Sequence, residues 1–128
     1  MLLVNENYRL ALNAALSESQ GKVLAMSAFI KRDGLVYLAE SISEGIDVKI
    51  VARWQKQDLL AGASDLDAFE FCLGRGWEFG VHPSLHAKVT LIDDESVFLG
   101  SANITNRGLS IDQPGNLEVG TALSIGSF

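Results

Sequence analysis

The hydrophobic positions along the chain follow two spacings, and together they predict the fold class. Apolar residues recur at helical spacing in three segments, residues 5–20, 33–45 and 64–76. Short apolar runs bounded by glycine or polar residues predict six strands, at residues 21–30, 47–54, 77–81, 86–93, 96–102 and 116–124. Helices and strands alternate at first, which favours parallel strands with helical crossovers, and the consecutive strands at the end favour antiparallel pairing. We therefore expect an α/β domain with a mixed sheet flanked by helices on both faces.

The third predicted helix carries clear local signals. Ser64 and Asp67 have the spacing of a capping box, in which two side chains close the first turn of a helix. Leu66, Phe69 and Leu73 follow at positions that share one helical face. We expect this apolar stripe to pack into the core.

The composition is that of an ordinary globular domain. The chain has 128 residues, enough for one domain, and 48% of them are hydrophobic. No apolar run reaches the roughly 18 residues that a membrane span needs, and the first residues lack the pattern of a secretory signal peptide. The single cysteine, Cys72, excludes an internal disulfide and a cysteine-rich zinc cluster, and we interpret it as a packing residue. These features predict a cytoplasmic protein.

The formal net charge of −6 argues against a surface that binds nucleic acid everywhere, because simple nucleic-acid-binding modules are normally basic. A local basic cleft is compatible with this charge. Arg53 and Lys56 follow the second predicted strand, and Arg107 lies further along the chain. These three residues are candidates for a wall of such a cleft. For the first two, the alternative is a solvated loop anchored by Trp54.

Two pairs of polar residues flank the predicted hairpin. His86 and Lys88 begin one strand, Ser101 and Asn103 end the next, and the members of each pair are two residues apart. Residues two apart in a strand share a face, so the four side chains are expected to converge. They offer a nitrogen nucleophile, a cation and neutral donors, the groups that phosphoryl transfer uses. Asp93 lies at an odd spacing from His86, and we interpret it as a supporting residue at the hairpin end.

The second histidine, His82, lies four residues before His86, a spacing at which two histidines can share a metal. Pro83 lies between them, the segment has loop character, and the sequence shows no third ligand. We interpret His82 as an ordinary loop histidine and predict no metal site.

The polar and glycine positions of this region form the pattern H-x-K-x4-D-x6-G-S-x-N. They are His86, Lys88, Asp93, Gly100, Ser101 and Asn103. This pattern resembles the HKD motif of the phospholipase D superfamily at every fixed position. The similarity extends through "AFIKRDGL", "VKIVARW" and "GSANITNRGL", and it covers most of the chain from Val23 onward. The chain resembles short bacterial nucleases of this superfamily and the N-terminal nuclease domain of phospholipase D-type restriction endonucleases.

The resemblance implies a single phospholipase D-like domain over residues 1–128 that hydrolyses phosphodiesters without a metal or another cofactor. In this superfamily a motif histidine attacks phosphorus and forms a phosphohistidine, and a second histidine protonates the leaving group. Carried over to this chain, His86 is the nucleophile or the acid, and Lys88 and Asn103 bind phosphate. Ser101 supports them.

A further element follows the motif in single-motif nucleases of the superfamily. Asn116 and Glu118 resemble its Asn-x-Glu pattern. A carboxylate that accepts the second ring N–H of a catalytic histidine fixes its tautomer and stabilises the imidazolium. The resemblance therefore implies that Glu118 orients His86, with Asn116 in a supporting role.

The chain contains one copy of the motif, whereas the two-histidine mechanism needs two. The resemblance therefore implies a homodimer that brings two His86 residues to its axis. Nucleic acid is the expected substrate. Two alternatives stay open: a phospholipid-type phosphodiesterase or transferase, and a non-catalytic or partner-dependent module of a larger helicase or restriction system. The sequence ends just after the last predicted strand, so we also expect the N-terminal part of a longer protein, with a DNA-binding partner or domain, as one arrangement.

Overall fold

The computed structural model describes residues 1–111 and 116–125, and its elements follow the predicted order with two additions. The helices are α1 (Glu6–Ser17), α2 (Arg32–Ala39), α3 (Lys56–Leu60) and α4 (Asp67–Arg75). The strands are β1 (Leu2–Val4), β2 (Lys22–Ser27), β3 (Asp47–Ala52), β4 (Glu78–Val81), β5 (Val89–Ile92), β6 (Ser96–Gly100) and β7 (Val119–Ser124). The additions are β1 and α3, which the sequence analysis missed because each is too short to show a hydrophobic period.

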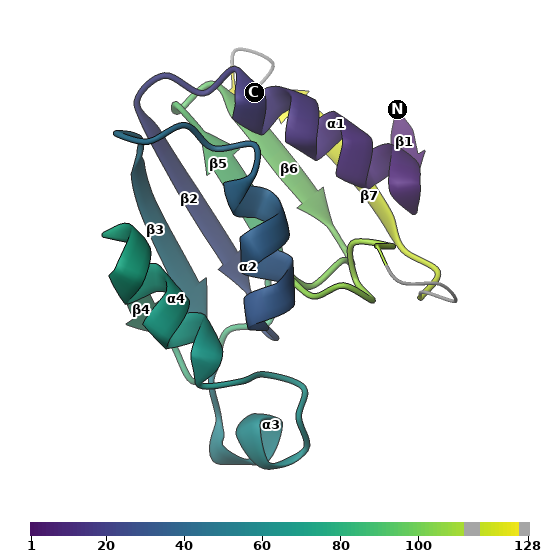
Figure 1. The fold of residues 1–128 in the computed structure, drawn as a ribbon. Helices are drawn as coiled ribbons and strands as arrows, with labels where there is room; N and C mark the ends of the chain where they lie inside the picture. Colours follow the sequence, from purple (N-terminus) through teal and green to yellow (C-terminus); the bar gives the residue numbers. More distant parts are fainter. Residues whose placement is uncertain (112–115, 126–128) are drawn as a thin grey trace.

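One mixed sheet forms the centre of the molecule (Figure 1). Its strand order is β1-β7-β6-β5-β2-β3-β4. Strands β2, β3 and β4 are parallel, and the pairs formed by β1, β7, β6, β5 and β2 are antiparallel. The expected α/β class and mixed sheet are therefore confirmed.

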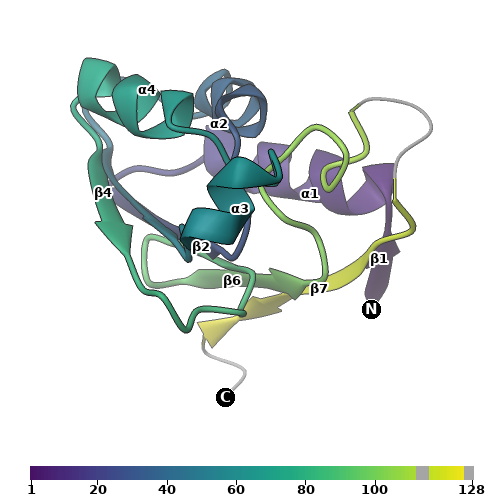
Figure 2. The same cartoon turned by 90° about the horizontal axis from the view of Figure 1, so that it is seen from below.

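The described helices all lie on one face of this sheet, so the expectation of helices on both faces was wrong (Figure 2). The reason is topological. Each crossover from β1 through α1 to β2, then through α2 to β3 and α4 to β4, moves in the same direction across the sheet. Right-handed crossovers that never reverse direction place every helix on the same side. The predicted alternation of helices and strands was correct. Alternation alone does not give the order of the strands in the sheet, and that order decides which face each helix covers.

The core lies between the sheet and these helices. Along β2, Val23 and Ala25 are buried beneath the helices, and the intervening Leu24 points to the other face and is half-buried. Helix α1 contributes Leu12 and Leu16 to the core. Within the described residues, no helix combines the length and apolar character that crossing a membrane requires.

Helix α4 packs through a different face from the one predicted. Its buried residues are Ala68 and Cys72, while Leu66 and Leu73 are 60% and 61% exposed. The two buried side chains are small, so they let the helix approach its neighbours closely. Burial raises the pKa of the Cys72 thiol to about 11, as expected for a packing residue.

The start of α4 also differs from the predicted capping box. Asp65, rather than Ser64, accepts a hydrogen bond from the amide of Ala68 at the start of the helix (3.0 Å). Ser64 is buried and accepts a hydrogen bond from the amide of Ile30. The predicted cap residue therefore fixes the loop after β2.

Candidate active site

The motif residues other than Asp93 gather at one end of the sheet, where β2 ends, β5 begins, β6 ends and β7 begins. The backbone joins these segments side by side: Gly100 N donates to Lys88 O (3.3 Å), and Ser101 N donates to Val119 O (3.0 Å). The next strand, β2, pairs with β5 through Met26 and Val89. Residues far apart in sequence thus meet at the same end of the sheet.

His86 and Lys88 precede the first residue of β5, Val89, so their placement in a strand was wrong. The register of β2 with β5 ends at Met26 and Val89, so the pairing stops before it reaches them. Their relation is instead local. Lys88 Nζ donates to the backbone oxygen of His86 (3.0 Å), and the His86 side chain is exposed. The histidine is therefore accessible to a substrate.

Asn103 is held through its side-chain oxygen. Its Oδ1 accepts a hydrogen bond from the amide of Phe29 (3.0 Å) and lies 3.1 Å from the hydroxyl oxygen of Ser27. Ser27 is fully buried, and its hydroxyl also accepts a hydrogen bond from Ile104 N (3.1 Å). Because Oδ1 is occupied, the Asn103 amide presents its NH2 end as the donor available to an anion.

Ser101 and Glu118 form a second connected pair. The Ser101 hydroxyl donates to Glu118 Oε1 (2.9 Å) and accepts from Val119 N (3.0 Å). The carboxylate is buried, and Asn5 fixes its backbone: Asn5 Oδ1 accepts from Glu118 N (2.8 Å). The predicted partner of Glu118 was His86. Over the described residues, no hydrogen bond joins these two, and the carboxylate is bound to Ser101.

Asp93 lies at the opposite end of the sheet, in the turn between β5 and β6. Its carboxylate accepts hydrogen bonds from the amides of Gln20, Gly21 and Lys22 at 2.8 to 2.9 Å. These bonds, that of Lys22 foremost, lower the pKa of Asp93. The residue ties the hairpin turn to the start of β2 and lies away from the other motif side chains, so a direct phosphate contact does not fit this position.

The three candidate cleft residues have different surroundings. Arg53 forms a bidentate ion pair with the buried Asp58 (2.6 and 2.9 Å), which lowers the pKa of that carboxyl. Its charge is thus paired within the fold. The alternative of a loop anchored by Trp54 agrees with the ring contacts of Trp54 with Phe69 and Phe79. Lys56 is exposed at the start of α3. Arg107 is exposed and donates to Asn116 Oδ1 (3.1 Å).

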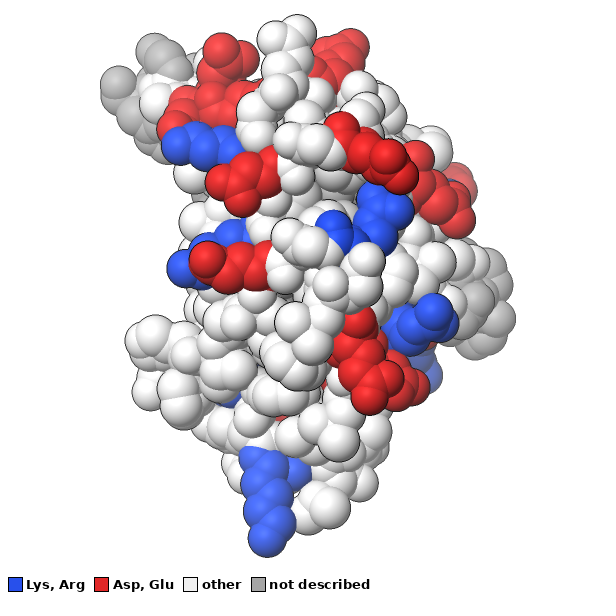
Figure 3. Space-filling model, turned by 60° about the vertical axis from the view of Figure 1, so that its left-hand side comes forward, with Lys and Arg blue, Asp and Glu red and all other residues white. Residues whose placement is uncertain are grey.

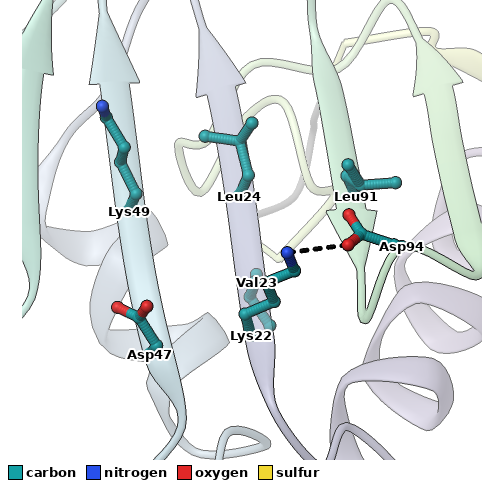
Figure 4. Close-up of a pocket in the computed structure, with 7 residues that line it drawn as sticks. All are labelled: Lys22, Val23, Leu24, Asp47, Lys49, Leu91 and Asp94. Carbon is teal, nitrogen blue, oxygen red and sulfur yellow. Dashed lines mark ion pairs between the residues drawn. The ribbon is translucent and has the colours of Figure 1, made fainter.

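A pocket of about 300 Å³ adjoins the motif at Asn103. It is lined by Phe29, Lys31, Asp33, Gly62, Ala63, Asn103, Thr105, Asn106, Arg107 and Asn116. A second pocket, of about 220 Å³, lies at the far end and on the open face of the sheet, where Lys22 and Asp94 form an ion pair (Figure 4). This second pocket is therefore separate from the motif residues.

His82 accepts a weak hydrogen bond from Ser84 N at Nδ1 (3.3 Å) and is exposed. In the part of the chain that the structure describes, no three His, Cys, Asp or Glu side chains are grouped as metal ligands.

Three positioning residues were missed by the sequence analysis: Asn5, Ser27 and Phe29. Ser27 carried a usable signal, since it is the one polar residue within the apolar run "VLAMSAFI". Phe29 acts through its backbone amide, and Asn5 acts across most of the chain length. Neither contact can be predicted from the neighbouring residues in the sequence.

Comparisons with known proteins show the family and the fold of the chain. A sequence model of the family described as cardiolipin synthase, PLD-like domain, matches residues 12–124. The chain belongs to this family. The resemblance inferred from the HKD motif is therefore confirmed for this phospholipase D-like domain. No curated protein sequence matches it.

Three solved structures share the fold of this phospholipase D-like domain. NucT from Helicobacter pylori is 19% identical with a TM-score of 0.66, over 99% of this chain and 86% of that one. Nuc from Salmonella typhimurium, a phospholipase D family member, is 20% identical with a TM-score of 0.70, over 97% and 82%. Phosphatidylserine synthase from Haemophilus influenzae is 15% identical with a TM-score of 0.75, over 97% of this chain but 32% of that one. At these identities the likeness shows the fold.

Proposed function

We propose that this domain hydrolyses phosphodiester bonds of nucleic acid without a metal, as a homodimer with one HKD motif in each subunit. The observation that carries the proposal is the convergence of His86, Lys88, Ser101, Asn103 and Glu118 at one end of the sheet. An exposed imidazole, an ammonium group and a pre-oriented amide donor are the groups that attack and stabilise a phosphoryl centre.

The proposed reaction has two displacements at phosphorus. In the first, a ring nitrogen of His86 attacks, and the bond from phosphorus to the leaving oxygen breaks while the partner subunit's His86 gives that oxygen its proton. In the second, water attacks the phosphohistidine, its proton passes to the partner subunit's His86, and the phosphorus–nitrogen bond breaks. A phosphomonoester and an alcohol leave, and both histidines regain their starting protonation.

Lys88 and Asn103 have separate roles in this scheme. The ammonium group of Lys88 balances charge on the non-bridging oxygens, and the Asn103 amide donates to them. Glu118 acts through Ser101, because its carboxylate accepts a hydrogen bond from the Ser101 hydroxyl. This pair fixes the end of β6 beside the reacting group. This replaces the direct orientation of His86 by Glu118 that the motif suggested.

Two considerations favour nucleic acid over phospholipid as the substrate. The motif itself resembles that of short bacterial nucleases. The basic side chains of Lys31 and Arg107 also lie beside the motif, because they line the same pocket as Asn103.

The test is nicking of supercoiled plasmid in EDTA by the wild-type chain and by His86→Ala. We expect wild type to produce open-circular DNA, and His86→Ala to be slower by at least about 100-fold, because loss of a covalent nucleophile removes the reaction path. His82→Ala is the matched control: it removes the other histidine, four residues away, and should retain activity.

Equal activity of His86→Ala and wild type would overturn the mechanism. If wild type leaves plasmid intact, phospholipid vesicles and bis(p-nitrophenyl) phosphate are offered next. Hydrolysis of vesicles alone would overturn the choice of nucleic acid. Inertness toward all three substrates would overturn stand-alone catalysis in favour of a partner-dependent module.

A further inference from the structure

The loop after β2 and the tail of the motif run side by side. The amide of Phe29 donates to Asn103 Oδ1, Ile30 forms an isolated parallel bridge with Ile104, and Lys31 N donates to Ile104 O (3.1 Å). These contacts place Lys31 next to the phosphate-binding motif although 72 positions separate it from Asn103. The pocket of about 300 Å³ opens along this junction.

Two basic side chains, Lys31 and Arg107, line this pocket. Elsewhere in the described residues, Lys22, Lys49 and Arg53 form ion pairs with carboxylates, whereas Lys31 and Arg107 form none. Their charges are therefore available to a ligand.

The other polar groups of the pocket support an anion site. Asn116 accepts one guanidinium N–H of Arg107, which holds that side chain at the wall and leaves its other donors for a ligand. Asp33 also lines the pocket, and its Oδ1 accepts from Asn106 N (3.2 Å). Two cations against one carboxylate leave the lining positive, in a chain whose net charge is −6.

The wider charge distribution points the same way. In Figure 3, acidic side chains are spread over the upper and middle parts of the molecule, with basic ones among them, and only the lowest part of the view carries basic and uncharged side chains alone. The motif lies toward this lower end, where β2 and β3 finish (Figure 1). A polyanion is therefore directed toward the motif rather than toward the hairpin end.

We propose that Lys31 and Arg107 bind a phosphate of a nucleic-acid strand that flanks the scissile phosphate. This inference rests on the proposed function and adds a subsite to it. Asn103 faces the scissile group, and the neighbouring pocket receives the adjacent nucleotide's phosphate. A nucleic-acid strand carries a phosphate on every nucleotide, whereas a diacyl phospholipid carries one phosphodiester, so the subsite selects a polymeric substrate.

The test compares a single-stranded 12-mer oligonucleotide with bis(p-nitrophenyl) phosphate, which has no flanking phosphate. The ratio of kcat/KM for the oligonucleotide to kcat/KM for the small diester should fall by about tenfold in Lys31→Gln and in Arg107→Gln. Lys22→Gln is the matched control, since it removes the same charge at the opposite end of the sheet and should keep the wild-type ratio. An unchanged ratio in both variants would overturn the subsite.

A binding measurement separates this inference from the proposed function. Fluorescence anisotropy with the labelled 12-mer is performed in the His86→Ala background, where no cleavage occurs. Adding Lys31→Gln should raise Kd by about three- to tenfold and make the plot of log K against log salt shallower by about 0.7. If wild type cleaves neither substrate, the proposed function fails, and this result still decides the subsite: equal Kd values would overturn it.

Discussion

Asn103 shows how single residues set the chemistry of the site. Its oxygen is occupied by Phe29 N and lies beside the Ser27 hydroxyl, so the amide has one orientation that satisfies its neighbours. Glycine supports the same residue from behind, because a Cβ on Gly108 would lie 2.3 Å from Asn103 O. The motif asparagine thus depends on residues that are not part of the motif.

Ser27→Ala tests this dependence. Removal of the buried hydroxyl leaves Ile104 N without its acceptor and frees the Asn103 amide to rotate. We expect a stability loss of about 1–3 kcal/mol in denaturant unfolding. Activity on bis(p-nitrophenyl) phosphate should fall by at least about tenfold, through a group that does not touch the substrate.

Ser64→Ala is the control for this variant. Ser64 is equally buried and accepts from Ile30 N, and among the described residues the hydrogen bonds to Asn103 Oδ1 come from Ser27 and Phe29 instead. It should lose comparable stability and keep most of its activity. Equal loss of activity in the two variants would assign the effect to general destabilisation.

At the scale of elements, β6 and β7 approach so closely that two glycines face each other. A Cβ on Gly100 would lie 2.8 Å from Gly120 Cα and from Val119 O, both backbone atoms that cannot move aside easily. The register pairs Gly100 with Gly120, one residue before Ser101 and two residues after Glu118. The glycine of the motif therefore sets the spacing at which Ser101 meets Glu118.

Gly100→Ala should separate the two strands. We expect a destabilisation of about 1–3 kcal/mol in thermal or denaturant unfolding, because the added methyl overpacks a rigid contact. Nuclease activity should fall as well, since the Ser101–Glu118 hydrogen bond is displaced.

Gly74→Ala is the control for Gly100→Ala: it makes the same chemical change, but we expect no loss of stability. Gly74 lies within α4, and an added Cβ would meet nothing within 4 Å. This variant should be unchanged or stabilised by up to about 1 kcal/mol. A stable, active Gly100→Ala chain would show that the close approach of β6 and β7 is dispensable.

At the scale of the whole molecule, the helices cover one face of the sheet and leave the other open (Figure 2). Leu24, Met26 and Leu91 on that face are half-buried. The site itself lies at an end of the sheet and contributes a single motif histidine, His86. In the proposed mechanism, the second histidine therefore comes from a second copy of the chain.

A purified heterodimer of wild-type and His86→Ala chains tests this requirement. Co-expression with two different affinity tags isolates the mixed species. If two His86 side chains share one reaction, the heterodimer should lose at least about 100-fold in activity, because it lacks either the nucleophile or the acid. Independent sites would instead leave half of the wild-type activity.

A heterodimer of wild-type and His82→Ala chains, prepared in the same way, should be fully active. Light scattering should give twice the mass of the chain for every preparation. A fully active monomer would contradict the shared site.

The fold class, the order of the longer helices and strands, and the motif residues from His86 to Asn103 could be predicted from the sequence. Hydrophobic spacing and short polar patterns are local, so they can be read without knowing the fold. Tertiary structure alone decided which face the helices cover, which side of α4 is buried, and where β5 begins. It also paired Arg53 with Asp58, Glu118 with Ser101 and Asn103 with Ser27. These outcomes depend on strand order and on contacts between distant residues, which local sequence does not encode.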